Sequence, residues 1–407
     1  MADNNENKVL NVPHLRFPEF SGEWEMSSIG EQFELYSGNT PSRMNKNQFD
    51  GSINWITSGE LKEHYISDTK EKISEEAAKN NSLKLLPVGT FVIAIYGLEA
   101  NGVRGTCSIT TRESTISQAC MAFTSKMDIQ NEFLYSWYKK HGNIIGIKYA
   151  QGTKQQNLSY DIIERFNISY PCMEEQKKLI RFISLIDQRI ATQNKIIEDL
   201  KKLKSAISKH LFARKDLLET TICLSNIATL KNGYAFQSGK YNALGKWKIL
   251  TITNVPGERY INDEDCNCII NLPNDIQDHQ VLKEGDILIS LTGNVGRVSL
   301  CKNGDYLLNQ RVGLLQLSKN VNREFLYQIL SSQRFENSMI ACGQGAAQMN
   351  IGKGDVESYV LPYSSNGNNI LWVAKILHSY DERIINELRR LTLLTMQRQY
   401  LLTQMFI

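Results

Sequence analysis

Polar segments flanked by glycine carry side chains that can recognise the edges of nucleic-acid bases. Arginine matches the two acceptors of guanine, and asparagine or glutamine matches the donor–acceptor edge of adenine. Threonine and lysine can position a duplex through its phosphates without reading its sequence. The alternative is that each segment is an ordinary solvent-exposed loop, and its recurrence in both halves of the chain favours the binding interpretation. The candidates in the first half are Asn39, Thr40, Arg43, Asn101, Arg104, Gln151, Thr153, Lys154, Gln155 and Asn157. Those in the second half are Thr292, Asn294, Arg297, Gln310, Arg311, Gln344, Gln348 and Asn350.

No pattern in the sequence predicts a catalytic or metal site. The segment Gly345–Lys353 has its glycines spaced wrongly for a phosphate-binding loop, and its lysine precedes glycine instead of serine or threonine. Glu60–Lys62 loosely resembles part of a nuclease site, in a pattern that is common by chance. The six histidines are isolated, and Cys266 and Cys268 are too close together for a zinc knuckle. We therefore expect no catalytic residue, no metal and no cofactor bound by this chain.

The composition is that of a soluble protein with more than one domain. The 407 residues are 42% hydrophobic and carry a net charge of +3, so any nucleic-acid surface must be local. We expect the eight cysteines to be reduced thiols, which favours the cytoplasm. The polar residues 1–8 do not resemble a signal peptide, and no apolar run approaches the length of a membrane span.

The second part of each half is a repeat at an almost constant offset. The segment Asn131–Tyr135 recurs as Arg323–Tyr327, and Asp187–Ile190 recurs as Asp381–Ile384. Several such matches in the same order are unlike chance similarity. The first part of each half matches more weakly. It contains two short aligned segments, which we call anchors and predict to be strands entered through turns. Between these anchors the two halves share little. The anchors align 88–93 with 284–289 and 55–58 with 249–252.

Apolar residues at three- and four-residue spacing end each half and predict a coiled-coil seam. Two polar positions interrupt each seam, Gln193 and Lys204 in the first and Glu387 and Arg398 in the second. The alternative is that each helix packs only on its own domain. Either orientation of a pair is open, and an antiparallel pair with centred registers predicts contacts of Glu387 with Lys204 and of Gln193 with Arg398. The seam residues are Ile183, Ile186, Ile190, Ile197, Leu200, Ile207, Leu377, Tyr380, Ile384, Leu391, Leu394 and Leu401.

Nearly the whole chain resembles the specificity subunits of type I restriction–modification enzymes. The resemblance lies in the opening Val12–Phe20, followed by Trp24 and Ile29-Gly30-Glu31, in Pro171 and Pro362 before the helices, and in the helix sequence of residues 185–212. One departure is the second junction, where Asn366-Gly367-Asn368-Asn369 replaces the acidic run Glu174-Glu175-Gln176.

The resemblance implies an α+β fold with two mixed α/β target-recognition domains, held apart by a long antiparallel two-helix coiled coil in a pseudo-two-fold repeat. The expected boundaries are 1–172 and 216–365 for the recognition domains, and 173–215 and 366–407 for the spacer helices. Each domain would read one part of a split, asymmetric site in double-stranded DNA.

The resemblance also implies the partners. Two methylation subunits would use S-adenosylmethionine, and restriction subunits with motor and nuclease activity would use ATP and magnesium. The rival interpretations are a standalone two-domain DNA-binding regulator, the specificity arm of a fused restriction enzyme and a coiled-coil scaffold. The fused enzyme is disfavoured because no methylase or nuclease region precedes the repeat.

Overall fold

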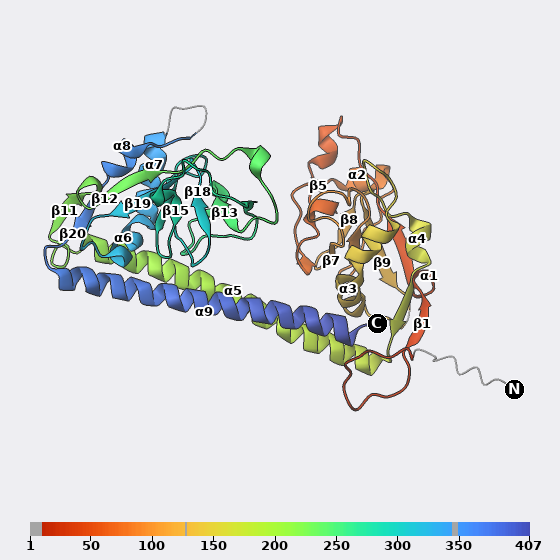
Figure 1. Ribbon diagram of the computed structural model, residues 1–407. Coiled ribbons are helices and arrows are strands. Elements are labelled where there is room, and N and C mark those ends of the chain that lie inside the picture. The colour runs from red at the N-terminus through yellow and green to blue at the C-terminus, as the bar shows by residue number, and fades with distance from the viewer. Residues whose placement is uncertain (1–9, 127, 344–348) are drawn as a thin grey trace. The chain divides into compact units, whose positions relative to one another are not determined.

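The structure, a computed structural model, describes residues 10–126, 128–343 and 349–407. The chain divides into two compact units (Figure 1), unit 1 with residues 1–192 and 391–407 and unit 2 with residues 193–390. Each unit contains mixed sheets, short helices and part of both long helices, α5 (Met173–Ala213) and α9 (Gly367–Met405).

Unit 1 is built on a five-stranded sheet of order β2-β9-β6-β7-β4, beside a three-stranded sheet of order β5-β3-β8 and the pair β1-β10. Its strands are β1 Glu25–Ser28, β2 Phe33–Ser37, β3 Ile53–Ile56, β4 Tyr65–Ile66, β5 Lys72–Ile73, β6 Phe91–Ala94, β7 Cys107–Thr110, β8 Ser114–Ile116, β9 Cys120–Ser125 and β10 Asn167–Tyr170. Its shorter helices are α1 Ile29–Gln32, α2 Glu75–Asn80, α3 Asn131–Tyr149 and α4 Tyr160–Glu164.

Unit 2 repeats this plan with sheets of order β12-β19-β16-β17 and β14-β13-β18-β15 and the pair β11-β20. Its strands are β11 Thr220–Cys223, β12 Ala228–Asn232, β13 Trp247–Leu250, β14 Asn267–Ile269, β15 Val281–Leu282, β16 Ile287–Ser290, β17 Val298–Leu300, β18 Tyr306–Leu308, β19 Val312–Leu317 and β20 Val360–Tyr363. Its shorter helices are α6 Arg323–Leu330, α7 Gln333–Gly343 and α8 Lys353–Glu357.

The two strand anchors expected from the sequence are equivalent in the structure. β6 and β16 each follow a glycine with positive φ, Gly89 at 85° and Gly285 at 82°, a conformation that disfavours side chains. β3 and β13 each pair in parallel with a later strand, β8 and β18 respectively. The weak sequence matches in the first part of each half therefore mark real structural repeats.

The two long helices begin in different ways, which explains the unlike junctions in the sequence. At the start of α5, Glu175 binds Arg16 of the opening segment at 2.8 and 2.6 Å, and this bond raises the pKa of Arg16. The side chain of Gln176 accepts from the Gln130 amide and donates to the carbonyl of Asp128. At α9, the side chain of Asn366 accepts from the backbone N–H of Asn368, as an N-cap does.

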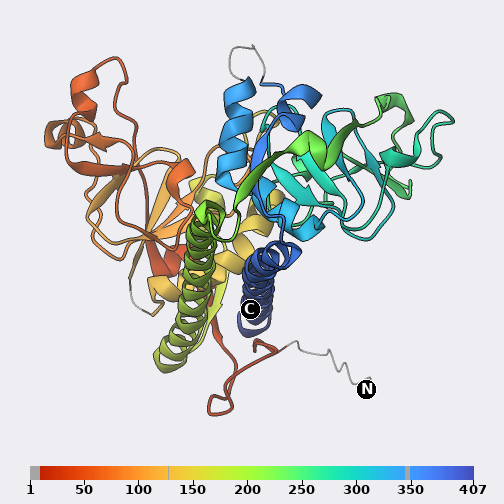
Figure 2. The same cartoon turned by 90° about the vertical axis from the view of Figure 1, so that its left-hand side faces the viewer.

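The segments of α5 and α9 within each unit lie side by side (Figures 1 and 2) and run antiparallel. In unit 2, Gln193 donates to Glu387 at 2.7 Å, and the later residue Lys204 binds the earlier residue Asp381 at 2.6 Å. In unit 1, Arg398 binds Asp187.

The contacts expected from centred registers, Glu387 with Lys204 and Gln193 with Arg398, are therefore wrong. The register of the two helices is instead one in which each basic seam residue, Lys204 or Arg398, binds an aspartate of the facing helix.

The ends of the long helices enter the cores of the two units. Phe406, just after α9, is buried in the core of unit 1, with its ring 5.2 Å from that of Phe133 on α3. Leu211, near the end of α5, is buried in the core of unit 2 together with Phe325 on α6. Each unit therefore includes the end of a helix that begins in the other half of the sequence.

Truncating a seam residue tests how far the helix pair stabilises unit 1. Ile183 is 2% exposed and Leu185, on the same helix, is 54% exposed. We expect Ile183→Ala to lower the free energy of unfolding by about 2–5 kcal/mol, because it leaves a cavity. Leu185→Ala should cost about 0.5 kcal/mol or less. Urea denaturation of the two variants measures the difference, and equal losses would contradict the buried seam.

Candidate nucleic-acid interface

Loops gather at one end of the main sheet in each unit. In unit 1, β2 and β6 end where β7 and β9 begin, because neighbouring strands are antiparallel. In unit 2, β12 and β16 end where β17 and β19 begin. We name these loop clusters the first rim and the second rim. The first rim comprises residues 38–43, 95–106, 117–119 and 151–157, and the second comprises 233–242, 291–297, 309–311 and 349–351.

The backbone holds both rims by equivalent hydrogen bonds. In the first rim, the N–H of Leu158 donates to Ile95 at 2.8 Å, and the N–H of Ile95 donates to Ala119 at 2.9 Å. In the second rim, the N–H of Ile351 donates to Leu291 at 2.9 Å, and that of Leu291 donates to Arg311 at 3.0 Å. The same main-chain hydrogen bonds thus join segments that are far apart in sequence in both rims.

A glycine starts each rim because no side chain fits there. A Cβ on Gly38 would lie 1.8 Å from the carbonyl oxygen of Ile116, and one on Gly233 would lie 2.1 Å from that of Asn309. Both distances are far below van der Waals contact. The chain leaves the first strand of each sheet by passing directly over the backbone of another segment.

Some candidate side chains of the first rim are exposed, whereas others bind residues of the protein itself or are partly buried. Arg43 binds Glu71 at 2.8 Å and lies over the ring of Phe49, in an exposed pair of the kind that contributes little to stability. Arg104 donates to Gln156 and fastens the loops 95–106 and 151–157 together. Thr40 and Asn157 are partly buried. The exposed candidates are Asn39, Asn101, Gln151, Thr153, Lys154 and Gln155.

The second rim shows the same division. Arg297 lies 3.5 Å from Glu336 on α7, and Thr292 is partly buried. The side chains of Gln310 and Arg311 are exposed and make no hydrogen bond or ion pair with the described part of the chain. Asn294 and Asn350 are also exposed, and Gln344 and Gln348 lie outside the described residues.

The structure adds rim residues that our sequence reasoning missed. Gln118 is exposed just before β9, as Gln310 is before β19, and extending the repeat upstream from Asn131 and Arg323 by 13 residues (131 − 118 and 323 − 310) would have paired them. Within the second rim, Tyr234, Phe236 and Lys240 line an open groove of about 470 Å³. Aromatic faces with a nearby cation suit stacked bases and phosphates.

The described residues contain neither a cluster of metal-ligand side chains nor a membrane-spanning helix. Within them, no three or more histidine, cysteine or acidic side chains gather in a way that could hold a metal ion. None of their helices is long and apolar enough to cross a membrane.

Comparison with known proteins relates both halves to one family. The family model described as the type I restriction modification DNA specificity domain matches residues 21–202 and again 219–394. The MjaVIII specificity subunit of Methanocaldococcus jannaschii is 25% identical over 350 residues, which cover 80% of this chain and 78% of that protein. The EcoR124I/EcoR124II specificity subunit of Escherichia coli is 27% identical over 201 residues, 48% of each chain.

Solved structures support the same fold. The crystal structure of a type I restriction–modification S subunit from M. genitalium covers 97% of this chain and 99% of its own, with a TM-score of 0.55 and 16% identity. A structure from work on assembly of the type I system covers 93% and 96%, with a TM-score of 0.59 and 14% identity.

Substituting the rim glycines tests the close backbone passage. We expect Gly233→Ala to destabilise unit 2 by about 2 kcal/mol or more, since the neighbouring carbonyl is backbone and cannot rotate away. Gly239→Ala is the matched control in the same loop, because nothing lies within 4 Å of its Cβ position. Thermal denaturation compares the two, and equal melting temperatures would show that the passage is looser than described.

Proposed function

The chain belongs to the type I restriction–modification DNA specificity family, and on this premise we propose that its two halves each read one part of a split DNA site. Specificity subunits of this family recognise DNA and do not themselves catalyse its methylation or cleavage. Residues 1–172 and 216–365 would be the reading domains, and 173–215 and 366–407 the spacer helices that set the gap between the two parts. A gap near one turn of DNA, about 34 Å, places both parts on one face of the duplex.

The observation that carries this proposal is the pair of rims. Their backbones are joined by equivalent hydrogen bonds, whereas their side chains differ: Ala119 in the first rim corresponds to the exposed Arg311 in the second. Equivalent frames with unlike side chains favour two different half-sites. The recognised sequence is then asymmetric and not a palindrome.

Exposure ranks the candidate contacts. Arg311 and Gln310 would be free to contact base edges, since neither side chain is held by the described residues. Lys154, at the exposed turn of its loop, suits a phosphate. Arg43, Arg104 and Arg297 would first have to leave Glu71, Gln156 and Glu336.

The chemistry would come from partner subunits. Two methylation subunits bring S-adenosylmethionine and methylate an adenine that is rotated out of the duplex in each half-site. Restriction subunits would add cleavage with ATP and magnesium. Exposed apolar side chains on the long helices, among them Leu203, Leu393 and Met396, offer surface for such partners.

Mapping methylated adenines in the host genome tests the whole proposal. We expect a split motif with one modified adenine per strand, which disappears when this chain is deleted. Exchanging residues 20–170 for those of a relative should change one half of the motif only. A change in both halves would contradict two independent readers, and tight DNA binding without any methylase partner would favour the standalone regulator.

Arg311→Ala tests the second rim at one residue. Loss of a contact to a base edge should weaken binding by about 1–3 kcal/mol and relax the sequence requirement at one position of one half-site. Lys319→Ala is the matched control, because Arg311 precedes β19 and the exposed Lys319 follows the opposite end of the same strand. Fluorescence titration with duplexes substituted at each position measures both effects. Equal weakening of DNA binding by the two variants would show that Arg311 makes no specific contact with DNA.

A further inference from the structure

A short segment in each unit is repeated more closely than the sequence analysis recognised. Glu63-His64-Tyr65-Ile66 in unit 1 corresponds to Glu258-Arg259-Tyr260-Ile261 in unit 2, with three of four residues identical. The expectation that the first parts of the halves share little between their anchors is wrong here. We call these segments the first joint and the second joint.

Both joints pair with the strand that leaves the rim. The N–H of Ile109 on β7 donates to the carbonyl of His64 at 2.8 Å, and the N–H of Leu300 on β17 donates to that of Arg259 at 2.8 Å. A serine hydroxyl on the same strand, Ser108 or Ser299, donates to the preceding glutamate carbonyl. Each joint is therefore fixed to its rim by the same main-chain pattern.

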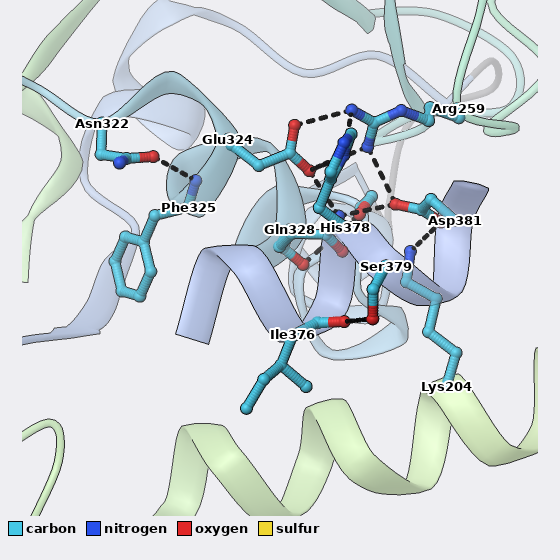
Figure 3. A network of polar contacts seen from close by, with 11 residues as sticks. Lys204, Arg259, Asn322, Glu324, Phe325, Gln328, Ile376, His378, Ser379 and Asp381 are labelled. Carbon is cyan, nitrogen blue, oxygen red and sulfur yellow. Dashed lines mark hydrogen bonds and ion pairs between the residues drawn. The ribbon is translucent and has the colours of Figure 1, made fainter. Parts of the chain in front are cut away.

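In unit 2, the joint also reaches the long helices through a buried polar network (Figure 3). The guanidinium of Arg259, 8% exposed, donates to Glu324 on α6 at 2.8 and 2.6 Å and to Asp381 on α9 at 2.9 Å. Gln328 donates to both carboxylates, and Lys204 of α5 binds Asp381 at 2.6 Å. One arginine thus connects the joint to α6 and, through Asp381, to both long helices.

The charges of this network are firmly held. Burial opposes the charge on Arg259, but its bonds to Glu324 outweigh that effect and raise the arginine's pKa above its ordinary value. Burial likewise opposes the charge on Glu324, and the bond from Arg259 nevertheless lowers the pKa of this carboxyl. Arg259 and Glu324 therefore keep their charges throughout the neutral range.

In unit 1, histidine occupies the place of the arginine. His64 Nε2 lies 2.9 Å from Glu132 on α3, and its ring is stacked between Tyr65 at 4.1 Å and Tyr135 at 3.8 Å. Tyr65 also donates to Glu132 at 2.9 Å, and burial raises the pKa of its hydroxyl to about 12. The titratable and charged groups around this joint are Tyr65 on β4, Cys107 on β7, Glu132, Tyr135 and Lys139 on α3, Asp187 on α5 and Arg398 on α9.

We propose that Arg259 and His64 are equivalent positioning residues that hold each rim in place relative to the helix pair. The guanidinium of Arg259 is permanently charged, whereas the imidazole at the equivalent place in unit 1 is charged only when it is protonated. This inference rests on the proposed function, since the helix pair would set the spacing between the two half-sites. Neither residue needs to touch DNA.

The direction of the pH effect follows from the charges. Histidine changes charge between about pH 5 and 8, and arginine does not. A protonated histidine beside a carboxylate forms an ion pair that the neutral ring cannot form. The first joint should therefore be tighter at pH 6 than at pH 8. The second should respond less to pH, because Arg259 keeps its charge, although His378 on α9 lies 3.0 Å from Arg259 and 3.5 Å from Glu324.

Exchanging the two residue types tests this difference. The full chain, assembled with its methylation partners, is titrated with duplexes carrying the mapped motif, either with its native spacer or with one base pair added. The measured quantity is the dissociation constant for the duplex with the added base pair divided by that for the native duplex. This ratio is determined at pH 6 and at pH 8. We expect the ratio to fall with pH for the unmodified chain, to be level for His64→Arg, and to fall by a further factor of roughly ten at pH 8 for Arg259→His.

Arg334→His, on the exposed face of α7, is the control for the new histidine and should behave like the unmodified chain. A purely structural role would weaken binding to both duplexes alike at both pH values and would leave their ratio unchanged. If the unmodified chain distinguishes the spacers and neither exchange alters the pH profile of the ratio, the positioning role is wrong. If the unmodified chain binds neither duplex, or binds both equally, the proposed function itself fails.

Discussion

The charge pairs across the helix seam set the register on which the rest of the structure depends. Asp187 and Asp381 occupy equivalent places in the repeat. Each binds a basic side chain of the facing helix, Arg398 for Asp187 and Lys204 for Asp381. Apolar seam residues alone would permit a shift by a whole heptad, since each heptad presents a similar surface. A shift would leave these largely buried charges unpaired, at a cost of several kcal/mol. The ion pairs therefore select one register from several that the apolar pattern allows.

The helices themselves could be predicted from sequence, whereas their register could not. Periodicity is a local property, and the repeat of two polar positions in each seam strengthened the interpretation. The predicted contacts assumed that polar seam residues meet one another, which the structure shows only for Gln193 with Glu387. The partners of the two basic residues are aspartates beside the seam, which the apolar pattern did not single out. Register depends on such partners, and sequence spacing does not reveal which of them will meet.

A similar limit applies to the rims. Residue type selected arginines that suit guanine, but Arg43, Arg104 and Arg297 have partners within the protein at sequence distances that no local pattern reveals. The joints are a different case, because three of their four residues are repeated in the sequence and were passed over where the surrounding match was weak. The comparison of units separates these roles: side chains that fasten loops have partners within the fold, while the side chain of Gln310 has none among the described residues.

The construction of the rims explains how two halves with one fold can differ in what they read. Main-chain hydrogen bonds and the close passages at Gly38 and Gly233 define the path of the loops. Exposed side chains such as those of Gln118 and Arg311 are not needed for that path, so their replacement costs little stability. The joints are the opposite case, because Arg259 lies in a buried network in which every charge requires its partner. Sequence change therefore lowers the stability of the fold little where the protein would face DNA, and much more where the rim meets the helices.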